Sequence, residues 1–255
     1  MINILLEGYD IAVSWLYDEL KAYIKPNHKV AVIALAYRDN RVKNLDDWNV
    51  LYDKNNGKYY NGIVDGLTAY GISVDNIKFI NYFTDSKETA KQKIENADIL
   101  YFPGGLPDRM FERIKELDLY DTIVNHKGIV MGYSAGAVIQ LSEYHLSPDD
   151  DYPEFSYYEG LGYLNDFYLE VHYEGADIQD ASIRRVIKER GKTVYATYLG
   201  NGAIIVDDGD VKLLGEVGRF IPKSAAASYL TDSLTGILKG DYDLDIAKSE
   251  RLSEK

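Results

Sequence analysis

Residues 128–137 read Gly-Ile-Val-Met-Gly-Tyr-Ser-Ala-Gly-Ala, an apolar run that leads into a serine between two glycines. The G-x-S-x-G pattern is typical of a nucleophile elbow, in which a strand bends sharply into a helix and exposes the serine hydroxyl. Gly132 and Gly136 lack the Cβ that would collide with neighbouring backbone in such a turn. The stretch therefore predicts a hydrolytic enzyme with Ser134 as its nucleophile.

Strand and helix patterns alternate on both sides of this stretch. Apolar runs predict strands over residues 1–6, 29–36, 77–80, 99–102, 128–131, 195–198 and 203–207. Apolar residues at three- and four-residue spacing predict helices over residues 12–24, 59–70, 87–96, 110–117 and 176–190. This alternation indicates an α/β fold, a three-layer α/β/α sandwich with a mostly parallel sheet and functional groups at the carboxyl ends of its strands.

The 255 residues favour one domain over residues 1–222, because no linker, low-complexity run or internal repeat interrupts them. Residues 223–255 become polar and charged, which predicts a C-terminal extension that is peripheral or frayed. The net charge of −13 opposes binding to nucleic acid or to anionic lipid. The amino terminus lacks a basic region and a long apolar run, so the expected location is the cytoplasm, with no membrane partner.

Chemistry that depends on a cofactor is not expected. The chain has no cysteine, four scattered histidines and no H-E-x-x-H or calcium-loop pattern, so no metal site is predicted. No phosphate-binding glycine pattern occurs either, which argues against a nucleotide cofactor.

A glycine pair and a histidine offer the partners that a serine nucleophile needs. Gly104 and Gly105 follow the predicted strand 99–102, and the amide of either glycine could form an oxyanion hole with that of Ala135. Of the four histidines, His172 alone lies where a strand ends in a loop, whereas the other three fall in turns or beyond the elbow helix. His172 is therefore the predicted general base.

Three segments together resemble one known family. Residues 102–105 (Phe-Pro-Gly-Gly), 132–137 and 171–173 (Val-His-Tyr) are similar in order and spacing to the peptidase E and cyanophycinase family. These are serine peptidases with a class I glutamine amidotransferase-like, flavodoxin-like fold. The resemblance covers residues 1–222 at the level of layout and implies Ser134 as nucleophile, His172 as base, and Gly105 and Ala135 as the oxyanion hole. Because the chain has no cysteine, glutamine chemistry through a thioester is excluded.

The resemblance leaves the third triad residue and the substrate open. It points to Asp150 within the acidic residues 149–151, while other members carry a Glu in a segment resembling residues 198–203, where this chain offers only Asn201. It implies small peptide substrates, such as dipeptides with an N-terminal Asp. Gly104 and Arg184 are then the candidate substrate-binding residues, with Arg185 and Arg109 as alternatives.

Two further hypotheses about the function remain open. The same elbow would serve an esterase or amidase, and the missing family Glu would suit a catalytically silent binding protein. Tyrosines are frequent, 23 in all, and gather between the elbow and His172. They would suit an active-site wall, a homodimer surface or ordinary core packing.

Overall fold

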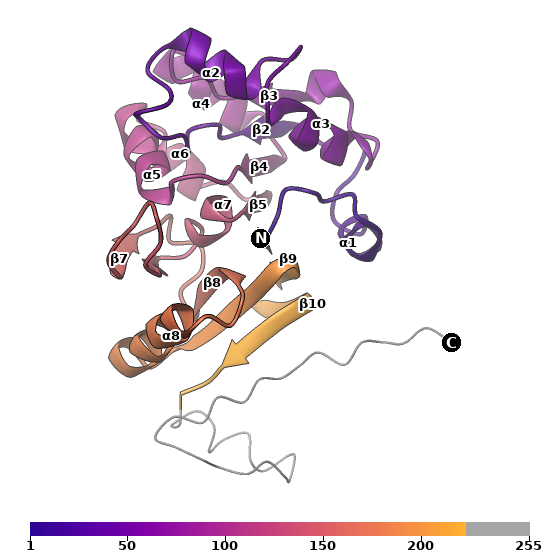
Figure 1. Cartoon of the computed structure of the whole chain (residues 1–255). Coiled ribbons are helices and arrows are strands. Elements are labelled where there is room, and N and C mark those ends of the chain that lie inside the picture. Colours follow the sequence, from indigo (N-terminus) through magenta and orange to yellow (C-terminus); the bar gives the residue numbers. More distant parts are fainter. Residues whose placement is uncertain (223–255) are drawn as a thin grey trace.

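The sheet is the centre of the fold. The computed structural model describes residues 1–222, and the extension predicted at residues 223–255 lies outside them. The main sheet runs in the order β10-β9-β1-β5-β4-β2-β3, with β8 also paired to β9 (Figure 1). Its strands are β1 (Ile2–Leu6), β2 (Val30–Val32), β3 (Ile77–Phe79), β4 (Ile99–Phe102), β5 (Ile129–Tyr133), β8 (Phe167–Tyr173), β9 (Thr193–Asp207) and β10 (Asp210–Phe220). Among the strand pairs of this main sheet within residues 1–222, only β1–β9 and β9–β10 are antiparallel, so the predicted mostly parallel α/β sheet is confirmed.

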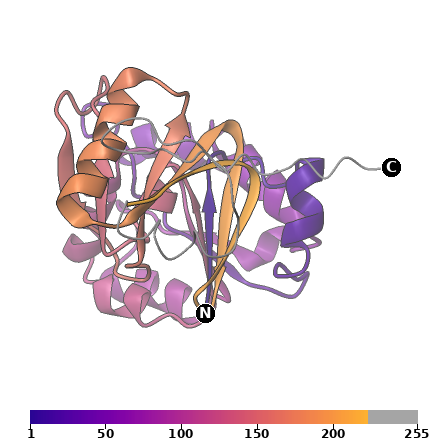
Figure 2. The ribbon, with the colours of Figure 1, turned by 90° about the horizontal axis from the view of Figure 1, so that it is seen from below.

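Helices cover both faces of this sheet (Figure 2). In β4, Ile99 and Tyr101 face one core cluster while Leu100 and Phe102 face another, because successive side chains of a strand alternate between its faces. The first cluster contains residues of α1 (Ser14–Leu20), α2 (Leu45–Tyr52) and α3 (Tyr60–Thr68). The second contains residues of α4 (Lys87–Glu95), α5 (Pro107–Glu116) and α6 (Tyr120–Val124). The result is the predicted three-layer arrangement.

Within residues 1–222, the remaining elements are a short helix that precedes β3 and four elements that follow β5 along the chain. They are η1 (Val74–Asn76), the elbow helix α7 (Ala135–Val138), the separate hairpin of β6 (Glu143–Leu146) and β7 (Ser156–Glu159), and α8 (Asp177–Arg190). Figure 1 shows α8 beside β8, and its buried residues Ile183 and Val186 share a core cluster with Phe220 of β10.

Three expectations from the sequence need correction. The two strands predicted at 195–198 and 203–207 are halves of the single strand β9. The strand predicted at 29–36 ends at Val32, because the next residues form short-range bonds from the Ala34 amide to the Val32 carbonyl and from the Leu35 amide to the Ile33 carbonyl. The helix predicted at 12–24 is shorter, since α1 spans Ser14–Leu20.

The long strand β9 brings two other strands together. The first half of β9 pairs with β8 in parallel, and its second half pairs with β1 in antiparallel orientation. Since β10 occupies the opposite edge of β9, the carboxyl ends of β1 and β8 point toward each other near residues 199–202. Residues far apart in the sequence therefore meet at this point.

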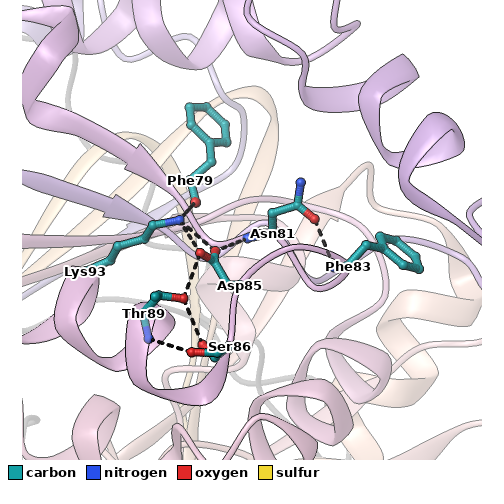
Figure 3. A network of polar contacts seen from close by, with 7 residues as sticks. All are labelled: Phe79, Asn81, Phe83, Asp85, Ser86, Thr89 and Lys93. Atoms are coloured by element: carbon teal, nitrogen blue, oxygen red, sulfur yellow. Dashed lines mark hydrogen bonds and ion pairs between the residues drawn. The ribbon is translucent and has the colours of Figure 1, made fainter.

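A polar network fixes the loop between β3 and α4 (Figure 3). The Lys93 ammonium donates to both Asp85 carboxylate oxygens, at 2.6 and 2.7 Å, and to the Phe79 carbonyl at 2.9 Å. The Asp85 carboxylate, only 8% exposed, also accepts from the Asn81 amide and the Thr89 hydroxyl. This loop carries Phe83, whose ring stacks on the ring of Tyr37.

Candidate active site

The serine lies on a strained turn between β5 and α7. Ser134 has φ 53° and ψ −116°, a conformation that is unfavourable for a residue with a side chain. A Cβ on Gly132 would lie 2.3 Å from the Gly136 carbonyl oxygen, and one on Gly136 would lie 1.8 Å from the Phe102 carbonyl oxygen. The collision predicted for both positions is confirmed, and the turn requires both glycines. The Ser134 amide donates to the Leu6 carbonyl at 3.0 Å, which ties the elbow to the end of β1.

His172 reaches the serine from the end of β8. Its Nε2 lies 2.8 Å from Ser134 Oγ, within hydrogen-bond distance. The other three histidines are engaged elsewhere: His28 binds the Lys25 amide, His145 contacts Glu170, and His126 lies beside the Asp98 and Ile129 backbone. The structure therefore brings together the serine and histidine that the sequence singled out.

A carboxylate that the sequence analysis missed extends the contact between Ser134 and His172 into a row of three side chains, Ser134, His172 and Glu7. Glu7 Oε1 lies 2.5 Å from His172 Nδ1, and Glu7 Oε2 accepts the Gly200 amide at 2.8 Å. Glu7 directly follows β1, and its side chain is 7% exposed. A carboxylate just beyond an apolar strand was a visible signal, since functional groups in α/β sheets gather at the carboxyl ends of strands.

The environment of Glu7 keeps it ionised. Burial acts to raise the pKa of Glu7, but hydrogen bonds from His172 and the Gly200 amide, with the charge interaction with His172, lower it below its ordinary value. An ionised Glu7 accepts the Nδ1 proton of His172, which leaves Nε2 free to accept a proton from Ser134.

Asp150 does not hold the position that the sequence analysis assigned to it. His172 Nδ1 contacts Glu7 instead, and the two neighbours of Asp150, Asp149 and Asp151, have partners of their own. The Asp149 carboxylate accepts the amides of Asp151 and Tyr152, and Asp151 forms an ion pair with Arg38. These contacts close a turn of the loop and engage Asp149 and Asp151 away from the histidine.

Asn201, the other candidate partner of His172, has its side chain beside β10. Its side-chain oxygen lies 3.1 Å from the position that a Cβ on Gly215 would occupy. The segment 198–203 instead presents the Gly200 amide to Glu7. A carboxylate from β1 thus occupies the region where the sequence resemblance suggested a Glu of that segment.

The glycine loop lies directly against the elbow. A Cβ on Gly104 would be 3.3 Å from the Ser134 Cβ and 2.5 Å from the Tyr133 ring, and Gly105 has φ 137° with the Ala36 carbonyl only 2.1 Å from its Cβ position. Burial raises the pKa of Tyr133 to about 12, so this phenol beside the loop is neutral. Because α7 has only four residues, any oxyanion stabilisation at Ala135 would come from single amides rather than from a long helix dipole.

A pocket of about 330 Å³ opens beside the glycine loop. Besides Gly104 and Gly105, its lining includes three cations, Arg38, Arg41 and Lys58. Arg38 is neutralised by Asp151, whereas Arg41 and Lys58 form no ion pair with any residue of 1–222. One carboxylate, Asp47, also lines the pocket and accepts the Lys43 amide. In a chain with net charge −13, the lining of this pocket carries a local excess of positive side chains.

A buried arginine supports one wall of this pocket and was not singled out from the sequence. Arg113 of α5 donates to the Tyr37 carbonyl at 2.9 Å and to the Leu35 carbonyl. Its guanidinium lies 3.7 Å from the centre of the Tyr37 ring, which Phe83 covers from the loop of Figure 3. The wall is therefore held by helix α5 and by the loop between β3 and α4.

The arginines proposed from the sequence lie elsewhere in ion pairs. Arg184 pairs with Asp180 at 3.4 Å, Arg185 with Glu189 at 3.0 Å, and Arg109 with Asp39 and Glu112. None of the three lines the pocket. The tyrosines between the elbow and His172 do not line it either, since its tyrosines are Tyr37, Tyr52 and Tyr59.

Within residues 1–222, no three His, Asp or Glu side chains are grouped as a metal site would require. Over the same residues, no helix combines the length and apolar character needed to cross a membrane.

A mostly parallel sheet with a serine on an elbow, bonded to a histidine, is the arrangement of serine hydrolases. The sequence model of peptidase family S51 matches residues 52–214, and the chain belongs to this family of serine-type peptidases. No curated protein sequence is significantly similar to the chain.

Two solved structures share the fold. A candidate peptidase E of Listeria monocytogenes EGD-e is 18% identical, with a TM-score of 0.58 over 84% of this chain and 98% of the other. A peptidase from an acI-B1 Actinobacterium is 16% identical, with a TM-score of 0.56 over 87% of this chain and 90% of the other. The resemblance to peptidase E is thereby confirmed at the level of family and fold.

Proposed function

We propose that the chain hydrolyses small peptides through an acyl-enzyme on Ser134, with His172 as general base and Glu7 as the carboxylate that orients it. The observation that carries the proposal is the continuous row from Ser134 Oγ to His172 at 2.8 Å and from His172 to Glu7 at 2.5 Å. Serine nucleophiles require such a base, and the base requires a group that fixes its tautomer.

The proposed reaction has two halves. Ser134 Oγ attacks the peptide carbonyl carbon while its proton passes to His172 Nε2, and the amides of Gly105 and Ala135 stabilise the resulting oxyanion. Collapse of this intermediate breaks the C–N bond, and His172 returns the proton to the leaving amine. Water then attacks the ester, with its proton again taken by His172, and the acid product leaves as Ser134 regains its proton.

The pocket beside the glycine loop supports the proposed substrate class. Arg41 and Lys58 are exposed cations without ion-pair partners in the described chain, and they border the loop next to the nucleophile. They would attract a carboxylate on the residue whose carbonyl is attacked. We therefore propose small peptides with an N-terminal Asp as preferred substrates, with Arg41 and Lys58 in the role that the sequence had suggested for Arg184.

The test is cleavage of a matched set of dipeptides, Asp-Leu, Asn-Leu and Leu-Leu, with simple esters, followed by mass spectrometry. Wild type and Ser182→Ala, a control serine within α8, should cleave Asp-Leu fastest, while folded Ser134→Ala should cleave nothing. Ester hydrolysis without peptide cleavage would favour an esterase. Absence of both, together with no covalent labelling of Ser134 by diisopropyl fluorophosphate, would favour a silent binding protein and refute the proposal.

A further inference from the structure

His172 stands in an irregular part of β8. Glu170 pairs with Ala196 and Tyr173 with Tyr198, so Val171 and His172 together lie opposite the single residue Thr197. This is a β-bulge, which redirects a side chain at the cost of regular pairing. His172 also has φ 55°, in the left-handed region that residues with a side chain avoid. Such a conformation persists only where the surrounding structure holds it.

One side chain binds the backbone within this bulge and just after it. The Gln179 Nε2 group donates to the His172 carbonyl at 3.0 Å, and the Gln179 Oε1 atom accepts the Glu174 amide at 2.9 Å. Gln179 is the third residue of α8, and the rest of that helix is packed through Ile183 and Val186. The amide therefore connects a firmly placed helix to the bulge.

Neighbouring contacts hold β8 but do not replace the two hydrogen bonds of Gln179, which form a clamp on the backbone of His172 and Glu174. The Tyr173 hydroxyl donates to Asp180 at 2.6 Å, and the Thr197 hydroxyl to the Glu170 carbonyl at 3.5 Å. Within residues 1–222, Gln179 is the side chain bonded to the backbone of His172 itself. An amide is suited to this task because it offers a donor and an acceptor on one rigid group.

We propose that Gln179 is a positioning residue, which holds His172 in its left-handed bulge and thereby keeps the imidazole against Ser134. The inference rests on the proposed function, in which His172 is the general base. Without the clamp, the His172 backbone can relax toward a regular strand and carry the ring away from the serine. A displacement of about 1 Å in a catalytic group is enough to lower a rate about 100-fold.

Three variants separate this role from others. Gln179→Ala removes both bonds, Gln179→Glu keeps an acceptor for the Glu174 amide but loses the donor while it is ionised, and Ser182→Ala removes a bond within α8 only. The readouts are kcat and KM on the best dipeptide, and the rate at which diisopropyl fluorophosphate labels Ser134. Thermal unfolding checks that each variant is folded.

For Gln179→Ala we expect kcat and the labelling rate to fall about 10- to 100-fold with KM within twofold, and for Ser182→Ala no change. The rate of Gln179→Glu relative to wild type should rise as the pH falls, because the protonated carboxyl regains a donor for the His172 carbonyl. A higher KM with unchanged kcat would make Gln179 a substrate contact and overturn the inference, as would labelling at the wild-type rate.

A crystal structure of Gln179→Ala keeps the two proposals separable. We expect φ of His172 to leave the left-handed region and the hydrogen bond from Ser134 to His172 to be lost. Unchanged geometry at His172 would overturn the role of Gln179 even if the wild type proved inactive. Failure of the wild type to cleave peptides or to be labelled would instead refute the proposed function.

Discussion

Replacing Glu7 by Gln tests the row of Ser134, His172 and Glu7 at the residue that the sequence analysis did not predict. The substitution keeps the size of the side chain and its ability to bind the Gly200 amide, but removes the charge beside His172. In the proposed mechanism His172 becomes positively charged when it takes the serine proton, so the charge of Glu7 would matter most in the transition state. The main expected effect is therefore on kcat rather than on KM.

The size of the effect follows from Coulomb's law. Two unit charges with centres ~4 Å apart, at an effective dielectric constant of about 20, interact by about 4 kcal/mol. Each 1.36 kcal/mol is about tenfold in rate, so Glu7→Gln should lower kcat about 10³-fold. The amide can also present its NH₂ group to Nδ1 and select the wrong tautomer, and loss of a triad Asp charge costs about 10⁴-fold in a well-studied serine protease.

The assay is single-turnover labelling of Ser134 together with steady-state cleavage of the best dipeptide. Asp150→Asn serves as the direct comparison, because the sequence resemblance favoured that residue, and Glu154→Gln, an exposed carboxylate on the same loop, is the surface control. Both should retain activity within about twofold. Wild-type kcat in Glu7→Gln, or a greater loss in Asp150→Asn, would refute the assignment of Glu7.

The same variant has a pH signature. Because the pKa of Glu7 in the folded chain lies below its ordinary value of 4.5, the ionised group stabilises the fold above about pH 4.5. That contribution is lost as the pH falls through the lowered pKa. Thermal unfolding of the wild type should therefore weaken more steeply below pH 4.5 than that of Glu7→Gln, and parallel curves would contradict the assignment of an ionised, stabilised Glu7.

Three other predictions concern the pocket, the elbow and the β3–α4 loop. Arg41→Met should raise KM about tenfold for Asp-Leu but not for Leu-Leu, since it removes one exposed charged hydrogen bond to the proposed substrate carboxylate. Lys78→Met is the control. An equal rise in KM for both dipeptides would contradict recognition of a carboxylate. Gly136→Ala should lower the free energy of unfolding by about 3 kcal/mol in urea, because the new Cβ would lie 1.8 Å from the Phe102 carbonyl oxygen. The control is Gly8→Ala, whose Cβ would meet nothing within 4 Å, and it should change the free energy of unfolding by less than about 0.5 kcal/mol. Lys93→Met should lower the free energy of unfolding by about 3 kcal/mol, because it leaves the buried Asp85 carboxylate without its cation. The double variant with Asp85→Asn should recover part of this loss. Strictly additive losses of stability would argue against the ion pair.

Local features of this chain were predictable because their causes are local. The elbow was visible because two glycines and an apolar strand specify the turn within ten residues, and His172 was visible because it ends an apolar run. The mostly parallel sheet and its two covered faces followed from alternating strand and helix patterns, whereas the order of the strands did not. By contrast, β10 was not predicted, since it carries charged residues and a glycine at its bulge and is partly exposed.

The missed carboxylate shows where sequence reasoning reaches its limit. Glu7 and His172 are separated by 165 positions, and no spacing rule connects them. Their contact depends on β9, a strand long enough to pair with β8 along one half and with β1 along the other. The sequence shows two apolar runs there, with Gly200 between them, which reads equally well as two strands and a turn.

The same geometry explains how the amino-terminal strand can complete the site. The Leu6 carbonyl accepts the Ser134 amide, and the next residue, Glu7, reaches His172, so β1 sets the distance between nucleophile and carboxylate. The Gly200 amide then holds the carboxylate from the side of β9, where the family resemblance had suggested that an acidic residue would stand. What a serine and histidine require is a buried negative charge at Nδ1, and either strand that borders this point can supply it. The identity of the third residue is therefore decided by which strands converge at the middle of β9, and not by its order along the chain.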